Sequence, residues 1–97
     1  MARYVQSLVT LTANQAAGTD PVLAAEGVSP GIRKAVIIGN PGAVAANVFL
    51  ATGGVAGSGM PIAAGGLLAF DGGLPGVDNA LYIVGLSTGD KVAVWVA

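Results

Sequence analysis

Turn-forming residues divide the most apolar part of this sequence into short segments. No residue between Ala35 and Phe70 is charged, but Asn40-Pro41-Gly42, Gly53-Gly54 and Gly65-Gly66 interrupt the stretch. A membrane-spanning helix needs about 20 consecutive apolar residues, which these interruptions do not leave. The segments between them are rich in β-branched and aromatic residues, a pattern typical of strands joined by turns. The sequence therefore predicts an all-β chain without a transmembrane segment.

The spacing of the segments predicts one antiparallel β-sandwich domain over residues 1–97, jelly-roll-like, with about seven to eight short strands. A chain of 97 residues can bury one hydrophobic core but not two. Residues 1–30 are expected to be less regular, with a strand at Arg3–Thr12 and then an arm that contains a short strand at 22–24. Further strands are expected on both sides of Asn40-Pro41-Gly42, on both sides of Gly65-Gly66, at 80–86 and at 91–97.

Two of the predicted turns should form hairpins. Pro41 presets the first φ of a type II turn, and Gly42 accepts the positive φ that follows. Gly65-Gly66 lies between two apolar arms, which matches a two-residue type I′ or II′ loop. Strand alternation in the second hairpin would direct Ile62, Leu68 and Phe70 to the core and Ala63, Leu67 and Ala69 outward.

The last strand is apolar on both of its faces. Val92, Val94 and Val96 alternate with Ala93, Trp95 and Ala97, whereas a two-sheet sandwich normally buries only one face of each sheet. Charged residues make up 9% of the chain, against roughly 25% in an average soluble protein. We therefore expect another subunit or a larger partner to cover the second apolar face.

The sequence offers little catalytic chemistry. It contains no histidine and no cysteine, so it lacks the commonest general base and any thiolate nucleophile. Ser87 and Lys91 are close enough in sequence for a Ser-Lys pair, but they flank the segment Ser87–Asp90, where turn formation explains them. Gly57-x-Gly59 lacks the third glycine of a nucleotide-binding motif. We expect no catalytic residue, no cofactor and no enzymatic activity.

The charged residues do not predict a site for nucleic acid or metal. Lys and Arg total 4, and Arg33-Lys34 is their one adjacent pair, so direct binding of nucleic acid is not expected. Asp71 and Asp78 bracket a loop that has fewer oxygen ligands than dedicated calcium loops, which favours solvated carboxylates over a metal site. Arg33-Lys34 is interpreted either as solvated or as one arm of a salt bridge to a partner. The N-terminus lacks the apolar segment of a secretory signal.

One order of segments stands out between Val36 and Ala97. A strand ends in Asn40-x-Gly42, and a second strand, a glycine-rich loop and a G-x-P-I-x-x-G segment from Gly59 to Gly65 follow. The pattern further includes Pro61, Ile62, Leu68, Phe70, and a final strand pair with Tyr82 and Trp95. This order resembles the small all-β structural proteins of tailed bacteriophages. The chain departs from their usual pattern at GLLAF, where a charged stretch is typical, and this favours a protein pressed against a lattice over an exposed fibre tip.

The resemblance implies a non-enzymatic virion protein that decorates or cements the capsid. Such a protein would bind the major capsid protein on the outer surface of the phage head, stabilise the head and form a homo-oligomer, with a trimer favoured. It would be assembled in the host cytoplasm and located on the capsid surface. The alternatives are a minor tail or head-fibre protein and a carbohydrate- or receptor-binding β-sandwich. The residues predicted to contact a partner are Tyr82, Trp95, Leu67, Arg33 and Lys34.

Overall fold

The computed structural model of the chain describes residues 5–24, 35–54, 59–71 and 80–97. These residues form seven β-strands and one short helix. In chain order the elements are β1 (Val5–Thr10), α1 (Ala13–Ala16), β2 (Ala35–Gly39), β3 (Ala46–Phe49), β4 (Met60–Ile62), β5 (Leu67–Asp71), β6 (Tyr82–Val84) and β7 (Lys91–Val96).

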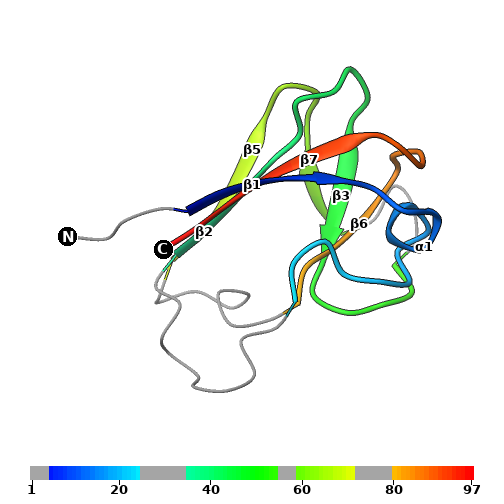
Figure 1. The fold of residues 1–97 in the computed structure, drawn as a ribbon, viewed down its shortest axis with the longest axis horizontal. Helices are drawn as coiled ribbons and strands as arrows, with labels where there is room; N and C mark the ends of the chain where they lie inside the picture. The colour runs from blue at the N-terminus through cyan, green and yellow to red at the C-terminus, as the bar shows by residue number, and fades with distance from the viewer. Residues whose placement is uncertain (1–4, 25–34, 55–58, 72–79) are drawn as a thin grey trace.

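The strands form two antiparallel sheets (Figure 1). The four-stranded sheet has the order β1-β7-β2-β5, and the three-stranded sheet has the order β4-β3-β6. Apolar side chains from both sheets form one core between them. The predicted all-β fold with two packed sheets is therefore confirmed, whereas the finer jelly-roll description stays a prediction. Within the described residues no helix has the length and hydropathy of a membrane span.

Alternation along the strands selects the residues that fill this core. In β2, Val36 and Ile38 are fully buried while Ala35 and Ile37 are only half-buried. In β5, Phe70 is buried while Leu67 is exposed, as the sequence predicts. The buried core residues are Leu11, Val22, Val36, Ile38, Ala46, Val48, Ile62, Phe70, Leu81, Ile83, Val92 and Val94.

Both predicted hairpins are wrong, because each turn carries the chain from one sheet to the other. β2 and β3 flank Asn40-Pro41-Gly42 but belong to different sheets, and so do β4 and β5 on the two sides of Gly65-Gly66. The reason lies in the neighbours of β2, which pairs with β7 on one side and with β5 on the other. No side of β2 remains for β3, so β3 pairs with β4 and β6 in the facing sheet.

The geometry of the two turns differs from the prediction accordingly. Gly42 is not among the described glycines with positive φ, and its N–H instead donates to Oδ1 of Asn40 at 3.2 Å. The second turn spans Ala63–Gly66, closed by the Gly66 N–H and the Ala63 carbonyl at 2.8 Å. Gly65 has φ of 73° at its third position, which is where a type II turn requires positive φ.

A short helix occupies the segment that was expected to be an irregular arm. Thr12 and Gln15 form a capping box: the Gln15 N–H donates to Oγ1 of Thr12 at 3.2 Å, and the Thr12 N–H donates to Oε1 of Gln15 at 2.9 Å. This reciprocal pair satisfies two N–H groups that a helix start leaves without partners. The strand expected at 22–24 is reduced to a single bridge between Leu23 and Leu81.

Candidate functional site

The register of the four-stranded sheet assembles an apolar surface on the side away from the core. One row across the sheet consists of Leu8, Ala93, Gly39 and Leu67, and the next consists of Gln6, Trp95, Ile37 and Ala69. We call these residues, together with Thr10 and Lys91, the outer face. Its two leucines are the exposed large apolar residues of this face, with Leu8 58% exposed and Leu67 64% exposed.

Trp95 lies against the sheet because Gly39 has no side chain. A methyl group added at Gly39 would lie 3.1 Å from Cζ3 of Trp95 and 3.7 Å from Cβ of Ala93. The indole ring therefore covers the glycine backbone and remains half-buried instead of projecting from the sheet. This close approach packs an apolar ring against the middle of the outer face.

A shallow hollow of about 190 Å³ adjoins the ring at the end of the sheet. Trp95, Ala93 and Leu67 contribute strand side chains to it, and the turns at Pro41 and Gly65-Gly66 close its far side. Few polar groups reach this hollow, so its chemistry suits an apolar side chain of a partner protein better than a charged ligand.

Asn40 holds together the two turns beside this hollow. Its side chain is 1% exposed, with Nδ2 donating to the Val44 carbonyl at 2.6 Å and Oδ1 accepting from Gly42. Its backbone N–H donates to the Gly66 carbonyl at 2.9 Å, and its carbonyl accepts from the Gly65 N–H at 2.8 Å. All hydrogen-bonding groups of Asn40 are thus used within the protein, and these bonds connect the 40–44 loop to the turn at Gly65-Gly66.

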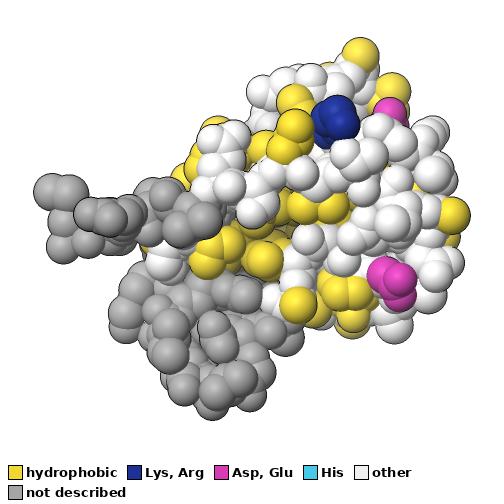
Figure 2. Space-filling view, in the orientation of Figure 1, with side chains coloured by type: hydrophobic (Ala, Val, Ile, Leu, Met, Phe, Trp, Pro, Cys, Tyr) yellow, Lys and Arg dark blue, Asp and Glu magenta, His cyan; other side chains and the backbone are white. Residues whose placement is uncertain are grey.

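The charged residue of the outer face, Lys91, lies at one end of it. Nζ of Lys91 donates to Oγ1 of Thr10 at 2.9 Å, across the two neighbouring strands. Figure 2 shows the side of the molecule where β1 and β7 lie in front. Apolar side chains are scattered over this side, and few charged side chains lie among them. The rows from Leu8 to Leu67 and from Gln6 to Ala69 contain no charged residue.

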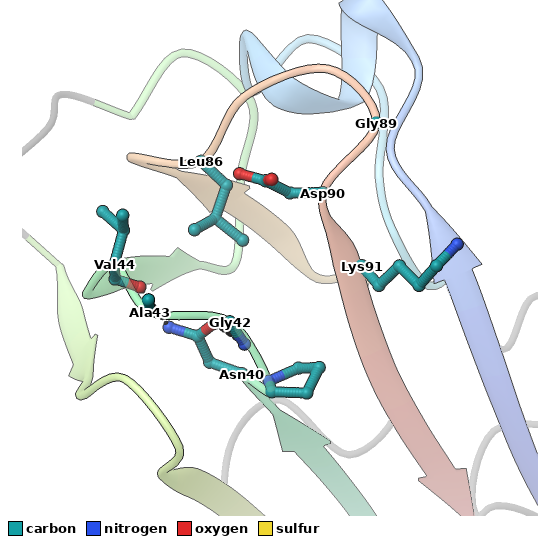
Figure 3. A pocket seen from close by; sticks show the side chains of 9 residues that line it. Asn40, Gly42, Ala43, Val44, Leu86, Gly89, Asp90 and Lys91 are labelled. Carbon is teal, nitrogen blue, oxygen red and sulfur yellow. Dashed lines mark hydrogen bonds between the residues drawn. The ribbon is translucent and has the colours of Figure 1, made fainter.

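A second hollow lies between the 40–44 loop and the turn before β7. It has a volume of about 450 Å³, within the range of small-molecule pockets. Figure 3 shows the carboxylate of Asp90 directed toward Leu86 over this cleft and Lys91 extending away from it, toward β1. Oδ2 of Asp90 accepts the Ser87 N–H at 2.9 Å, and the Asn40 amide at the cleft wall is also engaged.

These contacts leave no catalytic arrangement in the part of the chain that the structure describes. Ser87–Asp90 forms the predicted turn, closed by the Asp90 N–H and the Ser87 carbonyl at 3.0 Å. Lys91 donates to Thr10 instead of to Ser87. No three acidic, histidine or cysteine side chains cluster among the described residues.

The structure brings together two of the five predicted contact residues. Leu67 and Trp95 line the same hollow on the outer face. Tyr82 belongs to β6 in the other sheet and alternates with the buried Leu81 and Ile83, so it faces away from the core on the opposite side. Arg33 and Lys34 lie outside the described residues, as do Asp78 and the side chain of Asp71.

Sequence reasoning missed Leu8, Gly39 and Asn40 as parts of this site. Leu8 was assigned to a strand, but its place beside Ala93 and its exposure follow from the pairing of β1 with β7. The sequence signal for Asn40 was its position directly after an apolar strand and before proline, which predicts a turn but not a buried amide. Comparisons with protein-family models, with curated proteins and with solved structures found no match.

Proposed function

We propose that this chain is a non-enzymatic virion protein that decorates the head of a tailed phage and stabilises it. In this proposal the outer face of the four-stranded sheet lies on the major capsid protein at the capsid surface. The observation that carries it is the apolar outer face with exposed Leu8 and Leu67 and no charge in its two central rows. The order of segments from Val36 to Ala97, which resembles phage structural proteins, supports the identity of the partner.

The size of the outer face sets how strongly one copy can bind. Four strands spaced by about 4.8 Å, each contributing about five residues of 3.4 Å, give a footprint of about 300 Å². With the matching area of the partner included, binding removes about 600 Å² from water, which contributes at most about 15 kcal/mol at about 25 cal/mol per Å². That area is smaller than the roughly 1,200–2,000 Å² that stable interfaces bury, and association costs about 4–15 kcal/mol in lost freedom of motion, so a single copy binds weakly. Stable decoration then requires several faces bound at once, as a repetitive capsid lattice permits.

The direct test mixes purified protein with heads that lack decoration. Stoichiometric binding and a higher temperature of head disruption are expected. Leu67→Lys places a charge in the apolar row and should reduce binding at least about tenfold, because an unpaired charge at a desolvated interface is costly. Val44→Lys is the matched control, since Val44 is 57% exposed but lies in the loop between the sheets, away from the outer face. Absence of binding, or equal loss in both variants, contradicts the proposal.

Two further binding measurements separate the alternatives. Binding to purified tails in place of heads would assign the chain to a minor tail or head-fibre role. A carbohydrate-binding site needs an exposed aromatic ring with polar neighbours, but the neighbours of Trp95 in the sheet are Ile37, Ala93 and Gly39, with Gln6 as the one polar residue opposite it. A glycan array with specific hits that Trp95→Ala abolishes would favour the carbohydrate-binding alternative.

A further inference from the structure

β1 is an edge strand without the features that usually protect such edges. It pairs with β7 on one side, and no described strand pairs with its other side. Edge strands are commonly protected by proline, by charge or by being short. Among the other edge strands, β4 contains Pro61, β6 has three residues and β5 ends in Asp71. β1 has six residues, VQSLVT, with neither charge nor proline.

The hydrogen bonds around β1 show which of its backbone groups point to the free edge. The Leu11 N–H donates to the Asp90 carbonyl at 2.8 Å, so residue 11 faces the β7 side. N–H and C=O groups alternate sides along an antiparallel strand, so the odd-numbered residues of β1 face β7. The pair Ala35 and Ala97 exchanges hydrogen bonds of 3.1 and 2.9 Å on the far side of β7, which gives the same assignment. The N–H and C=O groups of Gln6, Leu8 and Thr10 therefore point outward.

We propose that this edge pairs with β1 of a second copy of the chain, antiparallel about a two-fold axis at Leu8. In that register Leu8 lies opposite Leu8 of the second copy, and Gln6 lies opposite Thr10. Each of the three pairs exchanges two backbone hydrogen bonds, which uses all outward N–H and C=O groups of these residues. If the second copy is shifted by one residue along the strand, outward-pointing N–H and C=O groups of one copy lie opposite inward-pointing groups of the other. If it is shifted by two residues, one of the three outward-pointing residues has no partner within β1 of the other copy.

A second copy fits this edge better than an unrelated strand because β1 is complementary to itself. The apolar Leu8 meets Leu8, and the polar Gln6 meets Thr10, so no apolar group is placed against a polar one on the outer face. The two-fold pairing closes on itself and leaves no further β1 edge for growth into fibres. It also joins the two outer faces into one eight-stranded surface of about 600 Å² by the same strand spacings. The inference therefore favours a dimer over the trimer that the phage resemblance implies.

The first experiment measures the mass of the purified chain in buffer by sedimentation velocity, without capsids, so its outcome does not depend on the proposed function. A dimer is expected. Leu8→Lys places like charges directly opposite each other across the axis and should raise the dimer dissociation constant at least about tenfold. Leu67→Lys is the matched control, because Leu67 is similarly exposed in the same row but belongs to β5 at the other edge. This variant should remain dimeric.

The second experiment tests the register with introduced cysteines, since the chain has none of its own. Leu8→Cys should form a disulfide-linked dimer under mild oxidation, because a hydrogen-bonded pair places the two Cα atoms about 5.5 Å apart. Thr10→Cys should not, because the two copies of residue 10 are offset by about 14 Å along the strands. Amide hydrogen exchange adds a readout without substitution: the N–H groups of Gln6, Leu8 and Thr10 should be protected in the dimer and exchange quickly on dilution.

Four results overturn the inference. The first two are a monomer at every concentration and a trimeric mass. The third is loss of the dimer in both lysine variants alike, which would place the contact on the outer face instead of the β1 edge. The fourth is cross-linking of Thr10→Cys as efficient as that of Leu8→Cys, which would contradict the proposed register.

Discussion

Replacing Asn40 by alanine should destabilise the fold by about 2 kcal/mol. Its side chain makes two hydrogen bonds, with the Val44 carbonyl at 2.6 Å and with the Gly42 N–H at 3.2 Å. Each contributes about 1 kcal/mol net, so losing both costs about 2 kcal/mol. In a domain of this size 1 kcal/mol shifts the melting temperature by about 4–8 °C, so Asn40→Ala should melt about 8–16 °C lower. Circular dichroism during thermal unfolding measures this, with urea unfolding as an independent check.

Two further variants separate the role of Asn40 from general effects on its loop. Val44→Ala keeps the accepting carbonyl and removes only an exposed side chain, so it should change stability by less than about 0.5 kcal/mol. Asn40→Asp keeps the acceptor for Gly42 but turns an oxygen toward the Val44 carbonyl. Burial raises the pKa of such a carboxyl, so the variant should lose stability as pH rises above about 4. A melting temperature of Asn40→Ala within about 2 °C of the original chain refutes the reasoning.

Two other predictions concern the core and one turn. Ile83 is fully buried, so Ile83→Ala should lower the free energy of unfolding by about 2–5 kcal/mol. Leu67→Ala, at an exposed position, should change it by less than about 0.5 kcal/mol. Urea unfolding measures both variants, and an equal loss of stability in the two would contradict the assigned core. Gly65 has φ of 73° and open space where a side chain would be, so Gly65→Ala should cost about 1–2 kcal/mol from backbone conformation alone. Calorimetry of that variant checks this value, and an unchanged melting temperature would count against the left-handed turn.

The strands could be predicted from the sequence, but their partners could not. Val36 and Ile38 alternate with less buried neighbours in β2, and alternation of this kind depends only on local backbone geometry. The turn residues at Asn40-Pro41-Gly42 and Gly65-Gly66 correctly mark the connections between consecutive strands. Whether the next strand pairs with the previous one or crosses to the facing sheet depends on which long-range neighbours occupy β2. That choice is made by residues far away in the sequence, and turn chemistry carries no information about it.

In the candidate site, too, the sequence predicts the orientation of single residues but not which residues lie side by side. Leu67 and Trp95 could be predicted as outward apolar residues because they alternate with core residues in their own strands. Their juxtaposition with Leu8 and Gly39 could not, because it follows from three cross-strand registers. Tyr82 was grouped with Trp95 as an aromatic residue of the final strand pair, and the structure places the two residues in different sheets. A half-buried aromatic residue in a strand predicts a surface contact, but only the sheet order says on which side.

The position of β7 between β1 and β2 has a consequence for synthesis on the ribosome. Thr10 and Lys91 are 81 residues apart, so β1 leaves the ribosome long before the strand with which it pairs. At about 5–20 residues per second that interval lasts several seconds. During this interval β7, the strand that lies between β1 and β2, has not yet been synthesised. The four-stranded sheet can therefore form only once residues 91–96 are available. Folding of this sheet is therefore expected to be a late and relatively slow event, governed by its non-local contacts.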